Sequence, residues 1–176
     1  MRRTMIFKSQ WGWLGVAESE RGLVGIVLPQ VSRARVEAGL RARASASFEE
    51  APSSRLRAAR KQLREYLAGT RTSFDLPLDL SQGTHFQRRV WKTLRAIPYG
   101  RLWSYRGLAS RVGGVQFARA VGGAVGANPL PIIVPCHRIV AHDGSIGGFS
   151  CGLPAKRKLL ALEDTLSQIR RTGRPR

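Results

Sequence analysis

The sequence predicts an α+β fold in two domains, a mixed N-terminal domain of residues 1–82 and an all-helical C-terminal domain of residues 83–176. Near the N-terminus, apolar and polar residues alternate, as is typical of half-buried strands. From Thr84 onward, the apolar residues recur every three or four positions, which indicates helices. This change of period places the domain boundary near residue 82, and 176 residues suffice for two small domains.

An antiparallel hairpin is expected at the N-terminus. Its two segments are MIFKSQWGWLGVAES, residues 5–19, and GLVGIVLP, residues 22–29, and the turn-like SERG separates them. Residues 31–52 are rich in Arg, Ala, Ser and Glu, so we expect a poorly specified connection with some helical character.

Two more elements complete the predicted N-terminal domain. In residues 54–70, Leu56 and Leu63 belong to a row of apolar residues at helical spacing that ends at Gly69, so a helix is expected. FDLPLDLS, residues 74–81, alternates again and predicts a strand.

The C-terminal domain is expected to begin with a helix over residues 84–97, which the Pro98-Tyr99-Gly100 turn ends. A short helix over 104–114, with Ser104 as its N-cap, and a second over 115–129 follow. Two short helices joined by a glycine turn outline a helix-turn-helix, and a packed helical hairpin that binds no ligand has the same outline. The last helix is expected over 154–171. Its buried face would consist of Leu159, Leu160, Leu162, Leu166 and Ile169.

The helix expected over residues 115–129 consists mainly of small residues around one arginine. Each glycine inside a helix costs about 1 kcal/mol relative to alanine, so such a helix gives up stability for close approach to a neighbour. Tight helix packing would use the same residues. Arg119 has no obvious packing role among them, and beside a duplex it could reach a phosphate or enter the base stack.

The net charge of +19 points to a polyanionic partner, and nucleic acid is the natural one. Residues 83–176 carry 16 basic and 3 acidic residues, whereas residues 1–82 carry 14 and 8, so the positive charge is concentrated in the second half. However, 25 of the 30 basic residues are arginines, which a GC-rich genome also produces without selection for binding.

Other features bound the function class. No apolar stretch reaches the roughly 18 residues of a membrane span, and the N-terminus lacks the apolar block of a signal peptide, so neither membrane insertion nor secretion is expected. Cys136 and Cys151 are the only cysteines, too few for a disulfide framework or a four-cysteine zinc site. A reducing cytoplasm is therefore the expected compartment.

The stretch NPLPIIVPCHRIV, residues 128–140, carries the chemistry-bearing pair of Cys136 and His137. A thiol at the end of a buried strand is usually inert, but a thiol beside a histidine can become a nucleophile. Tyr105 and Glu163 are further candidates. Glu163 follows an apolar LLAL run, so its carboxylate either turns inward to a buried histidine or lies at the edge of a solvated face.

Together with SYRGLA, ARAVGGAVGANP and GGFSCGLPAKRKLLALE, this stretch resembles the O6-alkylguanine-DNA alkyltransferase family, also called methylated-DNA–protein-cysteine methyltransferases. The resemblance is strong from Phe86 to Glu163 and looser over residues 1–82. It implies an N-terminal ribonuclease-H-like α/β domain and a C-terminal helix-turn-helix domain, similar to a winged helix, that holds the acceptor cysteine.

The resemblance implies direct DNA repair, in which each molecule once and irreversibly accepts the alkyl group of O6-alkylguanine on Cys136. Repair of O4-alkylthymine stays open. In this pattern His137 connects to Cys136 through water, Glu163 orients His137, and Tyr105 hydrogen-bonds guanine N3. Arg119 would replace the flipped nucleotide in the stack. The DNA-contacting residues would also include Ser104, Ala118, Ala120 and Gly122, and the substrate pocket would include Asn128, Pro131, Ile139, Phe149 and Ser150.

The chemistry agrees with these roles. A thiolate is a suitable nucleophile for a saturated alkyl carbon, and apolar neighbours such as Ile132 and Ile133 are expected to raise the pKa of Cys136, so that a base must activate it. The resemblance implies no cofactor or metal and no obligate protein partner. The protein is expected to act as a monomer on double-stranded DNA and to bind no membrane. The resemblance does not decide whether several molecules bind cooperatively along DNA.

Three residues depart from the family pattern: Phe117 where a small residue is frequent, Phe149 where tyrosine is common, and Cys151 near the expected pocket rim. Two other functions compete with repair. A non-enzymatic lesion-binding relative would lack the acceptor thiol, which is present here. A cysteine hydrolase using Cys136 and His137 would leave the basic charge and the Arg119 helix unexplained.

Overall fold

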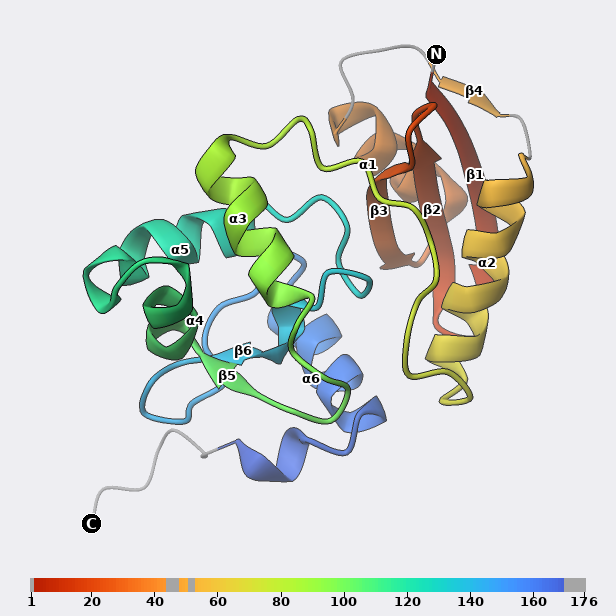
Figure 1. The fold of residues 1–176 in the computed structure, drawn as a ribbon. Coiled ribbons are helices and arrows are strands. Elements are labelled where there is room, and N and C mark those ends of the chain that lie inside the picture. Colours follow the sequence, from red (N-terminus) through yellow and green to blue (C-terminus); the bar gives the residue numbers. More distant parts are fainter. Residues whose placement is uncertain (1, 44–47, 51–52, 170–176) are drawn as a thin grey trace. The chain divides into compact units, whose positions relative to one another are not determined.

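The computed structural model describes residues 2–43, 48–50 and 53–169. Contacts divide the chain into two compact units, Met1–Gln82 with Pro129–Pro131, and Gly83–Asn128 with Ile132–Arg176. Both contain strands and helices, so the predicted mixed α/β character is confirmed (Figure 1). Within the described ranges, every helix is too short or too polar to cross a bilayer.

The first unit is built on a four-stranded sheet of order β3-β2-β1-β4, comprising β1 (Arg2–Ser9), β2 (Gly12–Glu18), β3 (Leu23–Gln30) and β4 (Phe48–Glu50). The first three strands form an antiparallel meander, and β4 pairs with β1 in parallel.

The expected two-stranded hairpin is therefore wrong in one respect, because its first segment is itself a hairpin that reverses between Ser9 and Gly12. Gly12 lies at φ 122°, where a Cβ would stand 2.6 Å from the carbonyl oxygen of Gln30. Glycine thus permits a tight turn that the alternation pattern did not reveal.

Helix α1 (Arg33–Arg43) packs on one face of this sheet and α2 (Ser54–Leu67) on the other (Figure 1). A Cβ on Gly15 would come within 2.5 Å of Val36, so the glycine lets α1 approach closely. Glu18 lies on the opposite face, as strand alternation requires, and its carboxylate pairs with Arg55 of α2 at 3.2 Å. The helix predicted over residues 54–70 is confirmed, with a shorter C-terminal end.

The strand predicted over residues 74–81 is wrong. Only one bridge forms, between Leu78 and Leu23, although Asp79 N–H does donate to the Leu23 carbonyl at 2.8 Å. Pro77 has no N–H to contribute to a ladder, which explains why pairing does not extend. The connection over 31–52 holds α1 and β4, as its helical character partly suggested, while residues 44–47 and 51–52 lie outside the described residues.

The second unit packs three helices together: α3 (His85–Leu94), α4 (Tyr105–Val112) and α5 (Ala118–Gly126) (Figure 1). The indole N–H of Trp91 in α3 donates to the Ala124 carbonyl in α5 at 2.8 Å, which ties the two helices together. A capping box at Thr84 begins α3, and Ser104 caps α4 as predicted. Helix α5 starts three residues later than expected, after the 3₁₀ turn η1 (Val115–Phe117).

This unit is not all-helical, which corrects the predicted class. Strands β5 (Trp103–Ser104) and β6 (Ile139–Val140) form a short parallel pair. In the chain, β5 directly precedes α4, and β6 directly follows the turn that holds Cys136. The last helix is also shorter than expected, because α6 (Leu153–Leu162) ends before Glu163, and Asp164 adopts φ 55°. After this break the chain continues in the 3₁₀ turn η3 (Leu166–Gln168), so Leu166 and Ile169 are only half-buried instead of lying on one helix face.

Candidate active site

Cys136 opens a single 3₁₀ turn, η2 (Cys136–Arg138), and no strand directly precedes it. The residues before it turn instead: Ile132 lies at φ 78°, a left-handed conformation that is strained for a β-branched side chain. Prolines at 129, 131 and 135 also lack the N–H groups of a ladder. The turn lets Asn128 reach back, and its amide donates to the Val134 carbonyl at 2.7 Å and to Cys136 Sγ at 3.0 Å.

The Cys136 thiol is 3% exposed, among apolar neighbours. Burial raises its pKa to about 11, and the hydrogen bond from Asn128 opposes that rise only in part. The expectation of a raised pKa is confirmed. At neutral pH the sulfur therefore carries its proton, and a base is needed to form the thiolate.

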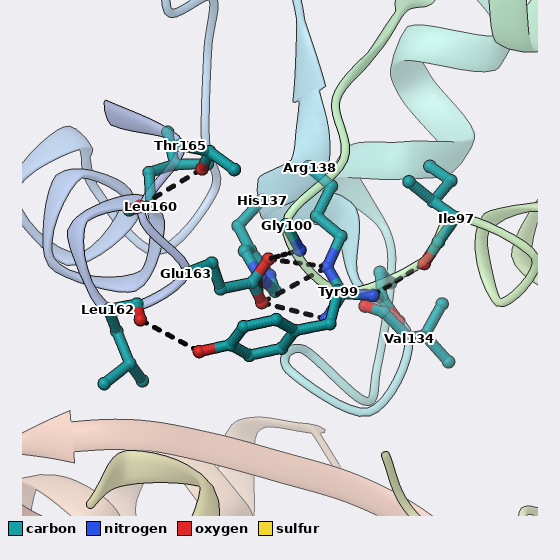
Figure 2. A network of polar contacts seen from close by, with 11 residues as sticks. Ile97, Tyr99, Gly100, Val134, His137, Arg138, Leu160, Leu162, Glu163 and Thr165 are labelled. Atoms are coloured by element: carbon teal, nitrogen blue, oxygen red, sulfur yellow. Dashed lines mark hydrogen bonds and ion pairs between the residues drawn. The ribbon is translucent and has the colours of Figure 1, made fainter. Parts of the chain in front are cut away.

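The side chains of His137 and Glu163 meet in the interior, which decides between the two orientations left open for Glu163. His137 Nε2 lies 2.9 Å from Glu163 Oε1, and both side chains are fully buried (Figure 2). Glu163 reaches inward because it caps the C-terminus of α6, where the chain leaves the helix. Arg138 binds the same carboxylate, with Nη2 at 2.8 Å from Oε1 and Nε at 2.9 Å from Oε2.

The protonation states follow from these contacts. Burial alone would raise the pKa of Glu163, but hydrogen bonds from His137 and Arg138 together with their charges lower it to about 2. Burial lowers the pKa of His137, although Glu163 opposes this. At neutral pH the carboxylate is ionised and the imidazole is neutral, the state in which a histidine can accept a proton.

The buried Glu163 carboxylate should make the free energy of unfolding sensitive to acid. Its folded-state pKa lies below the ordinary value of 4.5, so its stabilising contribution is complete above about pH 4.5 and is lost as the pH falls toward about 2. Denaturant unfolding measured between pH 5 and 2 should show this loss. In Glu163→Gln the slope of unfolding free energy against pH should fall by up to about 1.4 kcal/mol per pH unit. Asp79, with a pKa also lowered to about 2, contributes equally in both proteins, and an unchanged slope would contradict the expectation.

Tyr105 begins α4, and its hydroxyl donates a long hydrogen bond of 3.5 Å to the Gly148 carbonyl. Burial and the neighbouring Cys136 thiol raise the pKa of Tyr105, so the phenol keeps its proton and can donate it. Ser104, predicted to touch DNA, uses its hydroxyl to accept the Gly107 N–H at 3.0 Å as the cap of α4. The cap explains this serine without any DNA contact.

Helix α5 buries Val121, Ala124 and Val125 and turns its other residues outward. Arg119 and Ala120 are exposed, and Ala118 and Gly122 are half-buried beside them. A Cβ on Gly123 would meet nothing within 4 Å, so this side of the helix is bare backbone open to a partner.

The remaining predicted pocket residues differ in exposure. Ile139 is buried, Phe149 is half-buried and Ser150 is exposed, with its hydroxyl 4.0 Å from Cys151 Sγ. Pro131 is buried and groups with the first unit. An open hollow of about 470 Å³ lies next to Tyr105 and α5. Its lining consists of Tyr105, Arg106, Val115, Gln116, Ala118, Ala141 and His142.

Two buried cations were missed by the sequence analysis, Arg138 and Lys156. Lys156 is fully buried in α6 and donates to the carbonyls of Ile139 at 2.6 Å and Gly148 at 3.1 Å, and to that of Ile146. It therefore ties β6 to the loop that also receives Tyr105. Helical spacing could have revealed it, because Lys156 stands seven residues before Glu163, on the same buried face.

Phe117, one of the departures from the family pattern, forms the N-terminal end of α5 and is 44% exposed. Its ring lies 6.4 Å from that of Phe86. An aromatic side chain thus stands in the open, two residues before Arg119. Among the described residues, no group of three His, Cys, Asp or Glu side chains is arranged to hold a metal ion.

Comparisons with known proteins agree over both units. Residues 1–80 match the family description "6-O-methylguanine DNA methyltransferase, ribonuclease-like domain", and residues 85–165 match "6-O-methylguanine DNA methyltransferase, DNA binding domain". A methylated-DNA–protein-cysteine methyltransferase of Mycobacterium tuberculosis is 52% identical over 102 residues, which cover 58% of this chain and 61% of that protein. One from Mycolicibacterium paratuberculosis is 50% identical over 103 residues, covering 58% and 62%. The aligned part thus spans about three fifths of these curated relatives.

Solved structures extend the similarity to nearly the whole chain. A crystal structure of Mycobacterium tuberculosis OGT in complex with DNA has a TM-score of 0.77 and 39% identity, and covers 95% of this chain and 94% of that one. The O6-methylguanine-DNA methyltransferase of the archaeon Pyrococcus kodakaraensis has a TM-score of 0.71 at 29% identity, covering 93% and 99%.

Proposed function

Because this chain belongs to the 6-O-methylguanine DNA methyltransferase family, we propose that it repairs DNA by moving an alkyl group from guanine O6 to Cys136. The observation that carries the proposal is a buried Cys136 thiol that Asn128 contacts, followed in the chain by His137, whose ring pairs with the buried Glu163 carboxylate. A structural cysteine would not need this arrangement.

In the proposed reaction, the Cys136 proton passes toward His137, and the sulfur attacks the alkyl carbon from the side opposite O6. The S–C bond forms as the C–O bond breaks. The electron pair of the broken C–O bond stays on guanine, which leaves as an anion. Tyr105 neutralises this anion by donating its proton to guanine N3. Burial raises the pKa of Tyr105, so the phenol still carries its proton at neutral pH when the base departs.

Asn128 would assist from the sulfur side. Its amide N–H points at Sγ at 3.0 Å, and hydrogen bonds to a charged form favour that form. The thiolate that appears during proton transfer would thus be stabilised at the moment of attack. The product is a thioether, which water does not cleave, so each molecule would act once.

For DNA binding, we propose that α4 and α5 act as a helix-turn-helix related to a winged helix, with α5 as the helix that enters the groove. The bare side of α5 around Gly123 supports close approach to a minor groove, and Arg119 stands there with its guanidinium exposed. Ala118, Ala120 and Gly122 would add close contacts. The net charge of +19 would supply affinity through phosphates without sequence preference.

The proposed function also assigns roles to the two domains and indicates which partners the chain needs. Residues 83–176 would form the acceptor domain, and residues 1–82 the ribonuclease-H-like domain. Ile139, Phe149 and Ser150 would line the base pocket. One chain holds the Cys136 thiol, the His137 and Glu163 pair, and Arg119. The proposed reaction therefore needs neither a second subunit nor a cofactor. A reaction that consumes a reduced thiol also favours the cytoplasm.

The test is the stoichiometry of transfer. Incubating the protein with excess duplex DNA that contains O6-methylguanine should add one methyl group per protein, measured by intact-protein mass spectrometry. The number of repaired guanines should reach a plateau equal to the number of protein molecules. Repair of many guanines per protein would contradict a single-use acceptor and would favour a hydrolytic enzyme.

A further inference from the structure

Arg138 is a buried cation to which the proposed reaction assigns no step. Only 6% of it is exposed, and its guanidinium forms a two-pronged pair with the Glu163 carboxylate, Nη2 to Oε1 at 2.8 Å and Nε to Oε2 at 2.9 Å (Figure 2). Its other prong, Nη1, donates to the Ile97 carbonyl at 2.6 Å, and the Tyr99 ring lies 5.7 Å from the guanidinium carbon. A guanidinium held on three sides cannot rotate away from the carboxylate.

The hydrogen bonds around Glu163 occupy the whole carboxylate. Oε1 receives Arg138 Nη2 and faces His137 Nε2 at 2.9 Å, while Oε2 receives Arg138 Nε and the Gly100 N–H at 3.3 Å. An ionised carboxylate has about four acceptor positions, and all four are used here. Since neither oxygen can take a proton without losing a donor, the proton between Glu163 and His137 must stay on Nε2.

We propose that Arg138 is a positioning residue that holds Glu163 as a fully hydrogen-bonded anion and thereby keeps His137 a neutral imidazole protonated at Nε2. His137 Nδ1 is then the nitrogen that takes the proton of the Cys136 thiol. This inference rests on the proposed function and assigns a role to a residue outside the acceptor, its base and the DNA contacts.

The charges that face His137 explain why the arginine is needed. They are Glu163 at the end of α6, Arg138 in η2 and Lys156 in α6. Cys136 is the preceding residue in the chain, and Tyr99 is a further titratable group that feels the Glu163 charge. Burial lowers the pKa of His137, Glu163 raises it, and Arg138 and Lys156 lower it again. Without Arg138 the carboxylate would draw a second proton onto the imidazole, and an imidazolium cannot act as a base.

The test compares Arg138→Gln, which keeps an N–H donor but removes the charge, with Arg138→Lys, which keeps the charge. The chain has three histidines, so ¹⁵N NMR of the imidazole rings can follow each one, with His137→Gln as the assignment control. Wild-type His137 should be neutral and protonated at Nε2 from pH 6 to 8. In Arg138→Gln its pKa should rise by about one pH unit or more, and Arg138→Lys should largely restore the wild-type state.

Alkyl transfer from the free base O6-benzylguanine supplies the second readout, because it does not depend on DNA binding. The acid limb of the rate against pH should move to higher pH in Arg138→Gln, with about a tenfold loss at pH 7, and return in Arg138→Lys. Arg101→Gln, which removes a charge from an exposed position of the same unit, should leave the limb in place. A merely structural arginine would lower the rate equally at every pH.

Two results would overturn the inference. One is a wild-type His137 that rests as an imidazolium or carries its proton on Nδ1, a measurement that needs no variant and no activity. The other is a folded Arg138→Gln protein with the wild-type tautomer and acid limb. If wild-type protein transferred no alkyl group but showed the Nε2-protonated ring, the proposed function would fail while the role of Arg138 in the His137 tautomer stood.

Discussion

Replacing Cys136 by serine is expected to abolish alkyl transfer from DNA, whereas Cys151→Ser should retain it within about twofold. A neutral hydroxyl is a poor nucleophile at saturated carbon. The hydroxyl of a serine at this position would also have a higher pKa than the Cys136 thiol, so it would be harder to deprotonate. Cys136 Sγ has the Asn128 amide at 3.0 Å, and the next residue in the chain is His137, which pairs with Glu163. Cys151 is half-exposed, and its sulfur lies 4.0 Å from the Ser150 hydroxyl.

Peptide mapping after reaction with methylated duplex DNA identifies the modified cysteine. The methyl group should appear on the peptide that carries Cys136 in wild type and in Cys151→Ser. Both serine variants should bind undamaged duplex DNA with wild-type affinity, which controls for folding. A methyl group on Cys151 in the wild-type protein, with Cys136 unmodified, would overturn the assignment of the acceptor.

The pairing of Cys136 with its neighbours shows where sequence reasoning stops. The motif identified Cys136, His137 and Glu163, and the confirmed helices around residues 54–67 and 85–94 follow from apolar spacing alone. The apolar run before Cys136 forms no strand, because three prolines and the left-handed Ile132 turn the chain there. An apolar run does not distinguish a buried strand from a buried turn.

Arg138 and Lys156 escaped prediction for another reason. Basic residues are usually exposed, and in a chain with 30 of them nothing in the local pattern singles out Arg138, whereas only the helical spacing to Glu163 indicates Lys156. Their burial depends on tertiary partners: the Glu163 carboxylate for Arg138, and the carbonyls of Ile139, Ile146 and Gly148 for Lys156. The environment of Glu163 at the end of α6 is equally non-local, since its carboxylate meets His137 and Arg138, which lie far away in the sequence.

Arg119→Ala is expected to separate transfer to duplex DNA from transfer to the free base. Among the described residues, the Arg119 guanidinium makes no ion pair or hydrogen bond, and it stands exposed on the bare side of α5. If it fills the space left by an extruded nucleotide, its loss removes about 2–3 kcal/mol of compensation for unstacking. Transfer from O6-methylguanine in duplex DNA should then slow about 30- to 100-fold, while transfer from O6-benzylguanine should stay near wild type.

The salt dependence of binding distinguishes this role from a phosphate clamp. A residue that neutralises one phosphate would, when lost, lower the slope of log K against log salt concentration by about one and weaken binding to every duplex. An extruding residue instead changes the single-turnover rate at saturating DNA. We therefore expect Arg119→Ala to keep most of the wild-type salt slope, and Arg119→Lys, which cannot stack as a planar group, to recover little of the rate. Arg101→Ala, at an exposed position of the same unit, serves as the matched control for the loss of one charge. Equal losses on duplex and free base would mean that Arg119 supports the fold of α5, and recovery of the full rate by lysine would mean that its charge alone is used.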